Sequence, residues 1–220
     1  MNTGTTLLTP PRRPVARGSG ARRAVVAAGA LLLLGGCLHI QPPQPDRTRY
    51  YVLTAPAGAA APSGVAKAAG LPQFLNHVEV PGYLLNKPLA TRVGPNEVKF
   101  DDDVRWAEPL DQGIARVLRA RLAALTGVFG MAAPDVPHDY EVTVRVVRCE
   151  GDTEEGKDSV RFAADLELLA PSGTAAIAQR SFAATPIAWD GKDYGQLVSG
   201  LSRAVSELAD AIVALAPPKE

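Results

Sequence analysis

A cysteine near the N-terminus carries the clearest chemistry in this chain. Cys37 follows two small residues, Gly35 and Gly36, at the end of an apolar run over residues 24–34. Upstream of that run the sequence has no acidic residue and five arginines, namely Arg12, Arg13, Arg17, Arg22 and Arg23. A basic start, a short apolar stretch and a small-residue cleavage site, in this order, are typical of a secretory signal peptide. The apolar run is too short for a membrane-spanning helix.

The residues around the cysteine indicate what happens to its thiol. Leu34-Gly35-Gly36-Cys37 resembles a bacterial lipobox, whose cysteine takes a diacylglyceryl group before a peptidase cleaves the chain. We therefore predict a signal peptide over residues 1–36 and lipidation of Cys37. Several acyl chains on one residue give durable anchoring, at about 0.8 kcal/mol per buried methylene. Leu38 follows the cysteine where an aspartate would resemble an inner-membrane retention signal, so we expect the periplasmic face of the outer membrane.

Composition and charge narrow the class of protein further. The 220-residue chain has a formal net charge of zero, and cleavage removes five arginines and no acid, which leaves a mature net charge of −5. An acidic, lipid-anchored protein is a poor candidate for nucleic acid, which attracts clustered Lys and Arg. Once Cys37 is lipidated only Cys149 remains, so no intramolecular disulfide can form. Cys149 ends an alternating strand, and we predict that it is a small buried residue.

The sequence offers no recognisable catalytic constellation. The histidines His39, His77 and His138 are far apart, and none has the spacing of a metal-ligand pair. The nucleophile elbow and the Walker phosphate loop are both missing. The three carboxylates of residues 101–103 point in alternating directions, and we interpret them as a solvated charge run before a helix. We therefore predict no catalytic residue, no metal site and no cofactor.

One short stretch suggests contact with another protein instead. Arg105 and Trp106 precede Glu108 and Pro109, which suit the start of a helix. In one interpretation Trp106 fills the core and Glu108 complements the helix dipole. In the other, Arg105 and Trp106 contact a partner, because these two residue types dominate interface hot spots. We take the second as the working hypothesis, and a homo-oligomer is compatible with it because one membrane face concentrates lipid-anchored subunits.

Hydrophobic periodicity predicts the elements that position these residues. Apolar residues four or three apart indicate a helix that begins near Glu108 and ends at Gly127, and a second from Leu197 to Leu215. Alternating or β-branched runs predict strands over residues 50–53, 74–80, 89–93, 97–100, 140–146, 160–168 and 175–187. The fold predicted is one α/β domain over residues 50–216, with a mixed, mostly antiparallel sheet and two long amphipathic helices packed on it. Residues 37–49 form the predicted tether and residues 55–70 an Ala/Gly/Pro loop that we expect to be mobile.

Several of these stretches together resemble a known family. The lipobox, Tyr50-Tyr51-Val52-Leu53, the strand end Val78 to Leu84 and the stretch Arg105 to Leu110 occur in the order seen in the PqiC/YmbA family. These are auxiliary lipoproteins of ABC-type, MCE-linked transport systems. The resemblance implies a non-enzymatic periplasmic subunit that docks the MCE protein at the outer membrane. It also implies transport of phospholipid or other apolar cargo between the membranes, driven by an ATPase elsewhere.

Two further classes of protein stay open on the sequence alone. A lipoprotein enzyme acting on cell wall or lipid would need a triad, a metal site or a carboxylate pair, none of which is apparent. An outer-membrane assembly chaperone would bind many clients rather than one dedicated MCE protein.

Overall fold

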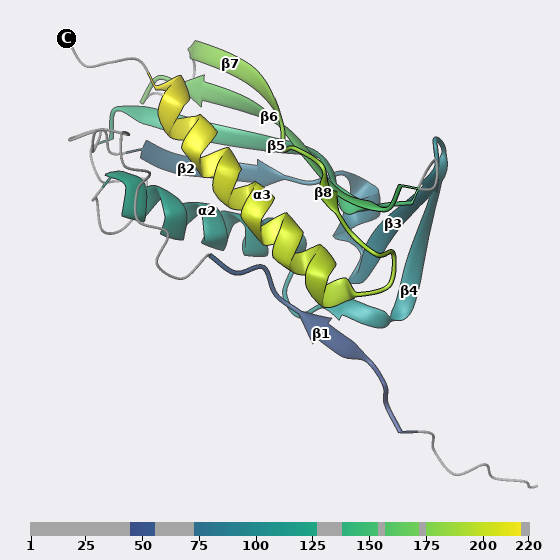
Figure 1. Cartoon of the computed structure of the whole chain (residues 1–220). Coiled ribbons are helices and arrows are strands. Elements are labelled where there is room, and N and C mark those ends of the chain that lie inside the picture. The colour runs from purple at the N-terminus through teal and green to yellow at the C-terminus, as the bar shows by residue number, and fades with distance from the viewer. Residues whose placement is uncertain (1–44, 56–72, 127–137, 154–156, 172–174, 217–220) are drawn as a thin grey trace, which may run out of the picture. The chain divides into compact units, whose positions relative to one another are not determined.

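The computed structural model describes residues 45–55, 73–126, 138–153, 157–171 and 175–216 (Figure 1). Residues 47–220 form one compact unit. The predicted signal peptide, Cys37, most of the tether and residues 56–70 of the predicted mobile loop lie outside the described ranges. Within those ranges, none of the helices has the length and apolar character needed to span a bilayer.

The described residues contain one sheet of eight strands, and its mixed direction confirms the prediction. They are β1 (Arg49–Tyr51), β2 (Gln73–Glu79), β3 (Pro88–Gly94), β4 (Glu97–Trp106), β5 (Tyr140–Asp152), β6 (Ser159–Leu169), β7 (Ala176–Ala183) and β8 (Ile187–Ala188). A short 3-10 helix, η1 (Gly82–Leu85), joins β2 to β3, and the two α-helices are α2 (Leu110–Thr126) and α3 (Tyr194–Leu215).

The long strand β5 organises the sheet. Along one edge it pairs in parallel first with β2, over residues 140–145, and then with β3, over residues 151–152. Along its other edge it pairs antiparallel with β6. β6 in turn carries β7 and β8 one after the other. Two shorter strands thus lie end to end on each side of the β5–β6 pair. The sheet combines parallel and antiparallel pairs, as the order of elements predicts.

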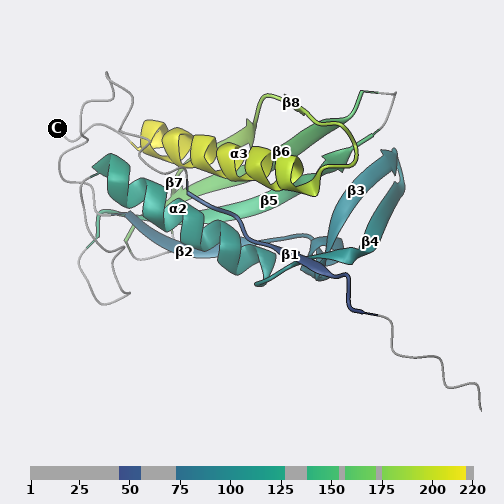
Figure 2. The same ribbon diagram turned by 60° about the horizontal axis from the view of Figure 1, so that its bottom comes forward.

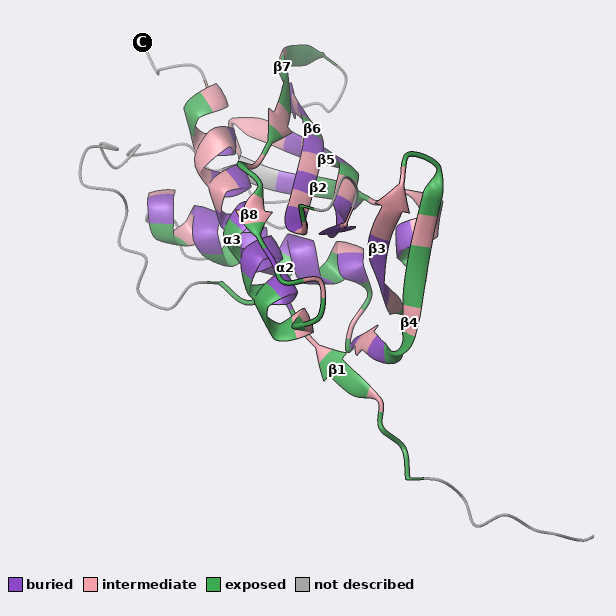
Figure 3. Ribbon diagram, turned by 45° about the vertical axis from the view of Figure 1, so that its right-hand side comes forward, coloured by how far each residue is buried: buried purple, intermediate pink, exposed green. Residues whose placement is uncertain are grey.

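Both helices cover the same face of the sheet (Figures 1 and 2). The predicted apolar stripe of α3 is confirmed, because Leu197, Leu201, Val205, Leu208 and Ile212 are all buried. At Gly200, α3 lies so close to β6 that a Cβ there would be 2.8 Å from Val160 Cγ2. Figure 3 shows the result as buried inner surfaces and an exposed outer strand β7. The core is therefore a single layer between sheet and helices.

Asp193 and Gln196 have the sequence spacing of a capping box at the start of α3. Asp193 caps the helix, since its carboxylate accepts hydrogen bonds from the N–H groups of Gly195 and Gln196. The side chain of Gln196 instead accepts from the N–H of Asp190, at 3.2 Å. Asp193 thus caps the helix, whereas the side chain of Gln196 stabilises the turn that precedes α3.

Two predicted strand boundaries are wrong for the same reason, and the single strand predicted over residues 175–187 is divided into β7 and β8. β4 continues to Trp106, so the acidic residues 101–103 lie within a strand rather than in a charge run before a helix. β5 continues to Asp152, six residues beyond the strand predicted over residues 140–146. Helix α2 begins at Leu110, two residues from the predicted start near Glu108. Pairing with neighbouring strands sustains β4 and β5 where local polarity suggested a loop.

Candidate functional site

The residue with the clearest predicted chemistry, Cys37, lies outside the described residues, as do Leu34, Gly35 and Gly36. Its lipidation stays a prediction. The second cysteine, Cys149, is buried as predicted, with 2% of its surface exposed. Burial raises the pKa of its thiol, so Cys149 stays protonated and unreactive in the folded protein.

Trp106 belongs to the core and not to the surface. Only 5% of it is exposed, and the same face of β4 carries the fully buried Val104. The backbone N–H of Trp106 donates to the carbonyl of Lys87 at 2.8 Å. The backbone N–H of the next residue, Ala107, donates to the carbonyl of Tyr51. These bonds hold the end of β4 between two neighbouring segments. The hypothesis that Trp106 contacts a partner is therefore corrected, and the alternative interpretation of a core tryptophan holds.

Arg105 lies on the opposite face of the strand from Trp106, because successive strand side chains alternate. It is half-buried, and its Nε donates to the carbonyl of Asp102 at 3.0 Å. In the parallel pairing of β1 with β4, Arg105 is the register partner of Tyr50, whose surface is 59% exposed. The exposed aromatic residue paired with Arg105 in the sheet thus comes from another strand, and it is not the neighbouring Trp106. We call Tyr50 and Arg105 the edge patch.

Glu108 does more than begin a helix. Its carboxylate forms an ion pair with Arg116, two turns into α2. Arg116 Nη2 also donates to the carbonyl of Leu53 at 2.8 Å. The pair therefore fastens the first half of α2 to the segment that follows β1. The expectation that Glu108 serves only the helix start was incomplete, whereas Pro109 does fill that role through its carbonyl, which accepts from the N–H of Gly113.

A buried ionic cluster, which sequence analysis missed, lies at the far end of β5. The side chain of Glu150 is fully buried, and its Oε1 accepts from Arg92 Nε at 2.6 Å and from Arg148 Nε at 2.9 Å. The hydroxyl of Tyr83 donates to its Oε2 at 3.0 Å. Burial raises the pKa of Tyr83 to about 12, and the charge of Glu150 adds to the shift. One carboxylate thus joins η1, β3 and β5.

The register of β5 explains why the cluster escaped prediction. A register irregularity between Val146 and Arg148 interrupts the alternation halfway along the strand. Beyond it Arg148, Glu150 and Asp152 share one face, and Arg148 Nη2 donates to Asp152 Oδ2 at 2.9 Å. A simple two-residue alternation from Tyr140 cannot foresee this shift. Three charged residues at alternate positions next to the buried Cys149 were the one signal in the sequence.

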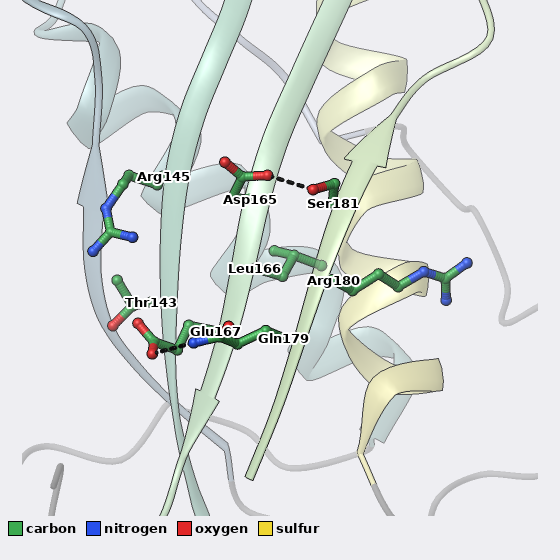
Figure 4. A pocket seen from close by; sticks show the side chains of 8 residues that line it. All are labelled: Thr143, Arg145, Asp165, Leu166, Glu167, Gln179, Arg180 and Ser181. Carbon is green, nitrogen blue, oxygen red and sulfur yellow. Dashed lines mark hydrogen bonds between the residues drawn. The ribbon is translucent and has the colours of Figure 1, made fainter. Parts of the chain in front are cut away.

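The face of the sheet away from the helices carries rows of polar side chains. One row crosses four strands as Glu79, Arg145, Asp165 and Ser181, and the next as His77, Thr143, Glu167 and Gln179. Arg145 Nε donates to Glu79 Oε2 at 2.8 Å, and Ser181 Oγ donates to Asp165 Oδ1 at 2.7 Å. Figure 4 shows part of these rows around a hollow of about 370 Å³. This face of the sheet is a solvated surface, and exposed pairs of this kind contribute little to the stability of the fold.

With this geometry in place, comparison with known proteins identifies the family. A family model described as the ABC-type transport auxiliary lipoprotein component matches residues 51–213. The chain belongs to this family. The PqiC/YmbA resemblance is thereby confirmed, and the protein is an auxiliary lipoprotein component of ABC-type transport. No curated protein matches it in sequence.

Two solved structures resemble this auxiliary lipoprotein in fold. One is an uncharacterized protein with a TM-score of 0.60 and 19% identity, covering 76% of this chain and 97% of its own. The other is a Xanthomonas campestris protein of the DUF330 family with a TM-score of 0.62 and 15% identity, covering 76% of this chain and 93% of its own. At these identities the likeness shows the fold alone.

Replacing Glu150 tests whether the buried ionic cluster holds the sheet together. We expect Glu150→Gln to lower the free energy of unfolding by about 3 kcal/mol, because two arginines lose their charged partner in a buried place. Chemical denaturation measures this loss. The matched control is Glu207→Gln, which removes an exposed ion pair with Arg203 on α3 and should change stability by less than about 0.5 kcal/mol. Equal effects of the two substitutions would show that the cluster is not a structural tie.

Proposed function

We propose that this auxiliary lipoprotein is a non-enzymatic subunit at the periplasmic face of the outer membrane. There it docks the MCE component of its transport system, so that phospholipid can pass between the membranes. The observation that carries the proposal is the edge patch, in which an exposed tyrosine and a half-buried arginine are register partners on the strand pair β1–β4. These residue types supply large contact area and multiple hydrogen-bond donors, which suits protein recognition.

The position of the edge patch in the sequence supports this role. β1 begins at Arg49, the last residue of the predicted tether over residues 37–49. A tether of that length limits how far β1 lies from the membrane, at no more than about 3.5 Å per residue. We infer that the lipid on Cys37 keeps the edge patch near the inner surface of the outer membrane, where an MCE protein reaching across the periplasm would arrive.

The distribution of apolar side chains supports docking rather than carriage of lipid by this subunit. The large aliphatic side chains of β5 and β6 are packed between the sheet and the two helices. The hollow on the opposite face is lined mainly by polar side chains such as Arg145, Asp165 and Glu167. We therefore assign the phospholipid path to the MCE partner, or to a homo-oligomer that frames it, and not to a cavity in one subunit.

Substitution of Cys37 tests the membrane attachment. Cys37→Ala should leave an unprocessed precursor, or a form lost from the outer membrane, because the thiol that receives the diacylglyceryl group is gone. Membrane fractionation and the apparent mass of the protein in whole cells measure this. Normal processing and normal outer-membrane fractionation of the variant would refute the predicted lipidation.

Substitution of the edge patch tests the docking surface. We expect Tyr50→Ala and Arg105→Ala in the full-length lipoprotein each to weaken co-purification of the MCE protein by about tenfold. The melting temperature should change little, since Tyr50 is mostly exposed.

Two controls separate binding from folding in this experiment. Glu108→Ala breaks the ion pair with Arg116 and should lower the melting temperature while leaving partner binding intact. Arg203→Ala removes an exposed arginine on α3 and should change neither property. If Arg105→Ala instead destabilises the protein and leaves binding unchanged, Arg105 is a structural residue.

A further inference from the structure

A second surface lies between the outer edge of β2 and helix α2. Asn76, His77 and Val78 form one side of a hollow of about 570 Å³. The other side is a stripe of α2 and the residues before it, made of Glu108, Asp111, Gln112, Ala115, Arg116 and Arg119. Among the described residues, β2 pairs with β5 alone, so one row of its backbone N–H and C=O groups faces this groove. A groove between an open strand edge and a helix is a known mode of peptide recognition, in which the peptide adds a strand.

The charged side chains on the helix side of the groove differ in whether they are already paired. Glu108 and Arg116 form an ion pair with each other. Asp111 and Arg119 form no hydrogen bond or ion pair with any residue that the structure describes. Between these two, Ala115 presents only a methyl group, and 8% of the residue is exposed. Among the residues that the structure describes, the groove therefore offers an unpaired carboxylate, a small apolar floor and an unpaired guanidinium, in that order along α2.

The spacing of these three residues matches that of a strand. Asp111, Ala115 and Arg119 are separated by four residues each, which is a rise of about 6 Å per step along an α-helix. Every second residue of an extended chain points to the same side, at a spacing of about 6.7 Å. Three alternate side chains of an added strand would thus meet Asp111, Ala115 and Arg119 one by one.

We propose that this groove binds an extended segment of a partner protein as an added strand on β2. Its alternate side chains are basic, apolar and acidic, facing Asp111, Ala115 and Arg119 respectively. Antiparallel pairing is the more stable arrangement, and α2 runs in the opposite direction to β2 (Figures 1 and 2). The segment then runs with α2, so its sequence order is basic, any residue, apolar, any residue, acidic.

The irregularity of β2 indicates where recognition must come from. The register with β5 shifts between Leu75 and His77, which leaves Asn76 as a bulge. A bulged edge discourages regular pairing with an arbitrary strand. Side-chain contacts with α2 must therefore supply much of the selectivity, and the charge order becomes the property to test. This inference goes beyond the proposed function, because it concerns a different surface from the edge patch and does not depend on the MCE protein being its partner.

The test uses two synthetic peptides and the full-length lipoprotein in detergent. The first peptide, T-V-K-T-V-T-E-V-T, places Lys, Val and Glu at alternate positions, and the second, T-V-E-T-V-T-K-V-T, reverses the charges. We expect the first to bind about tenfold more tightly by fluorescence anisotropy, since two attractive pairs become two repulsive ones. Hydrogen exchange should show protection of the β2 amides on binding.

Charge reversal in the protein completes the test. Asp111→Lys combined with Arg119→Glu should reverse the preference between the two peptides. Arg119→Glu alone should abolish the preference, which keeps the test valid if the double variant is unstable. The matched control, Arg203→Glu with Glu207→Lys, reverses an exposed pair on α3 and should leave the preference unchanged. Equal binding of the two peptides, binding of neither, a preference that survives reversal, or protection confined to β7 would each overturn the proposal.

Discussion

The buried carboxylate of Glu150 is the constraint on which the arrangement of this domain depends. A fully buried charge is tolerated only when it is paired and hydrogen-bonded, and Glu150 obtains its partners from η1, β3 and β5. Those partners fix the corner between β2 and β3, two strands that pair one after the other with the same edge of β5. The β3–β4 hairpin, the pairing of β4 with β1 and the start of α2 all follow from that corner. The edge patch and the groove beside β2 each combine residues that precede this corner in the sequence with residues that follow it.

Periodic patterns made the helices and the core predictable from the sequence. The stripe of α3 from Leu197 to Ile212 and the alternation in β6 both point into the single core, as the structure shows. The mixed sheet followed from one helix between strand regions and from tight turns elsewhere. These features depend on residues close together in the sequence, where the side-chain period alone decides which face is buried.

The site was harder to predict because it depends on pairings between distant segments. Arg105 and Trp106 are neighbours in the sequence, but β4 extends through them and places their side chains on opposite faces. The exposed aromatic partner of Arg105 is Tyr50, more than fifty positions earlier, and only the parallel register of β1 with β4 brings them together. The Glu150 cluster likewise needs the bulge in β5 and the packing of η1. Strand length, bulges and register are set by tertiary contacts, which local residue types do not encode.

The central claim is that the edge patch docks one dedicated transport protein. The most direct measurement is photo-crosslinking in living cells, with a photoreactive phenylalanine derivative in place of Tyr50 in the full-length lipoprotein. Mass spectrometry then identifies the crosslinked proteins, and the same derivative in place of Arg203 on α3 gives the background. We predict one dominant adduct, with an MCE-domain protein, that is specific to position 50. Crosslinks to many unrelated envelope proteins, as a chaperone would give, or only to further copies of this chain would contradict it.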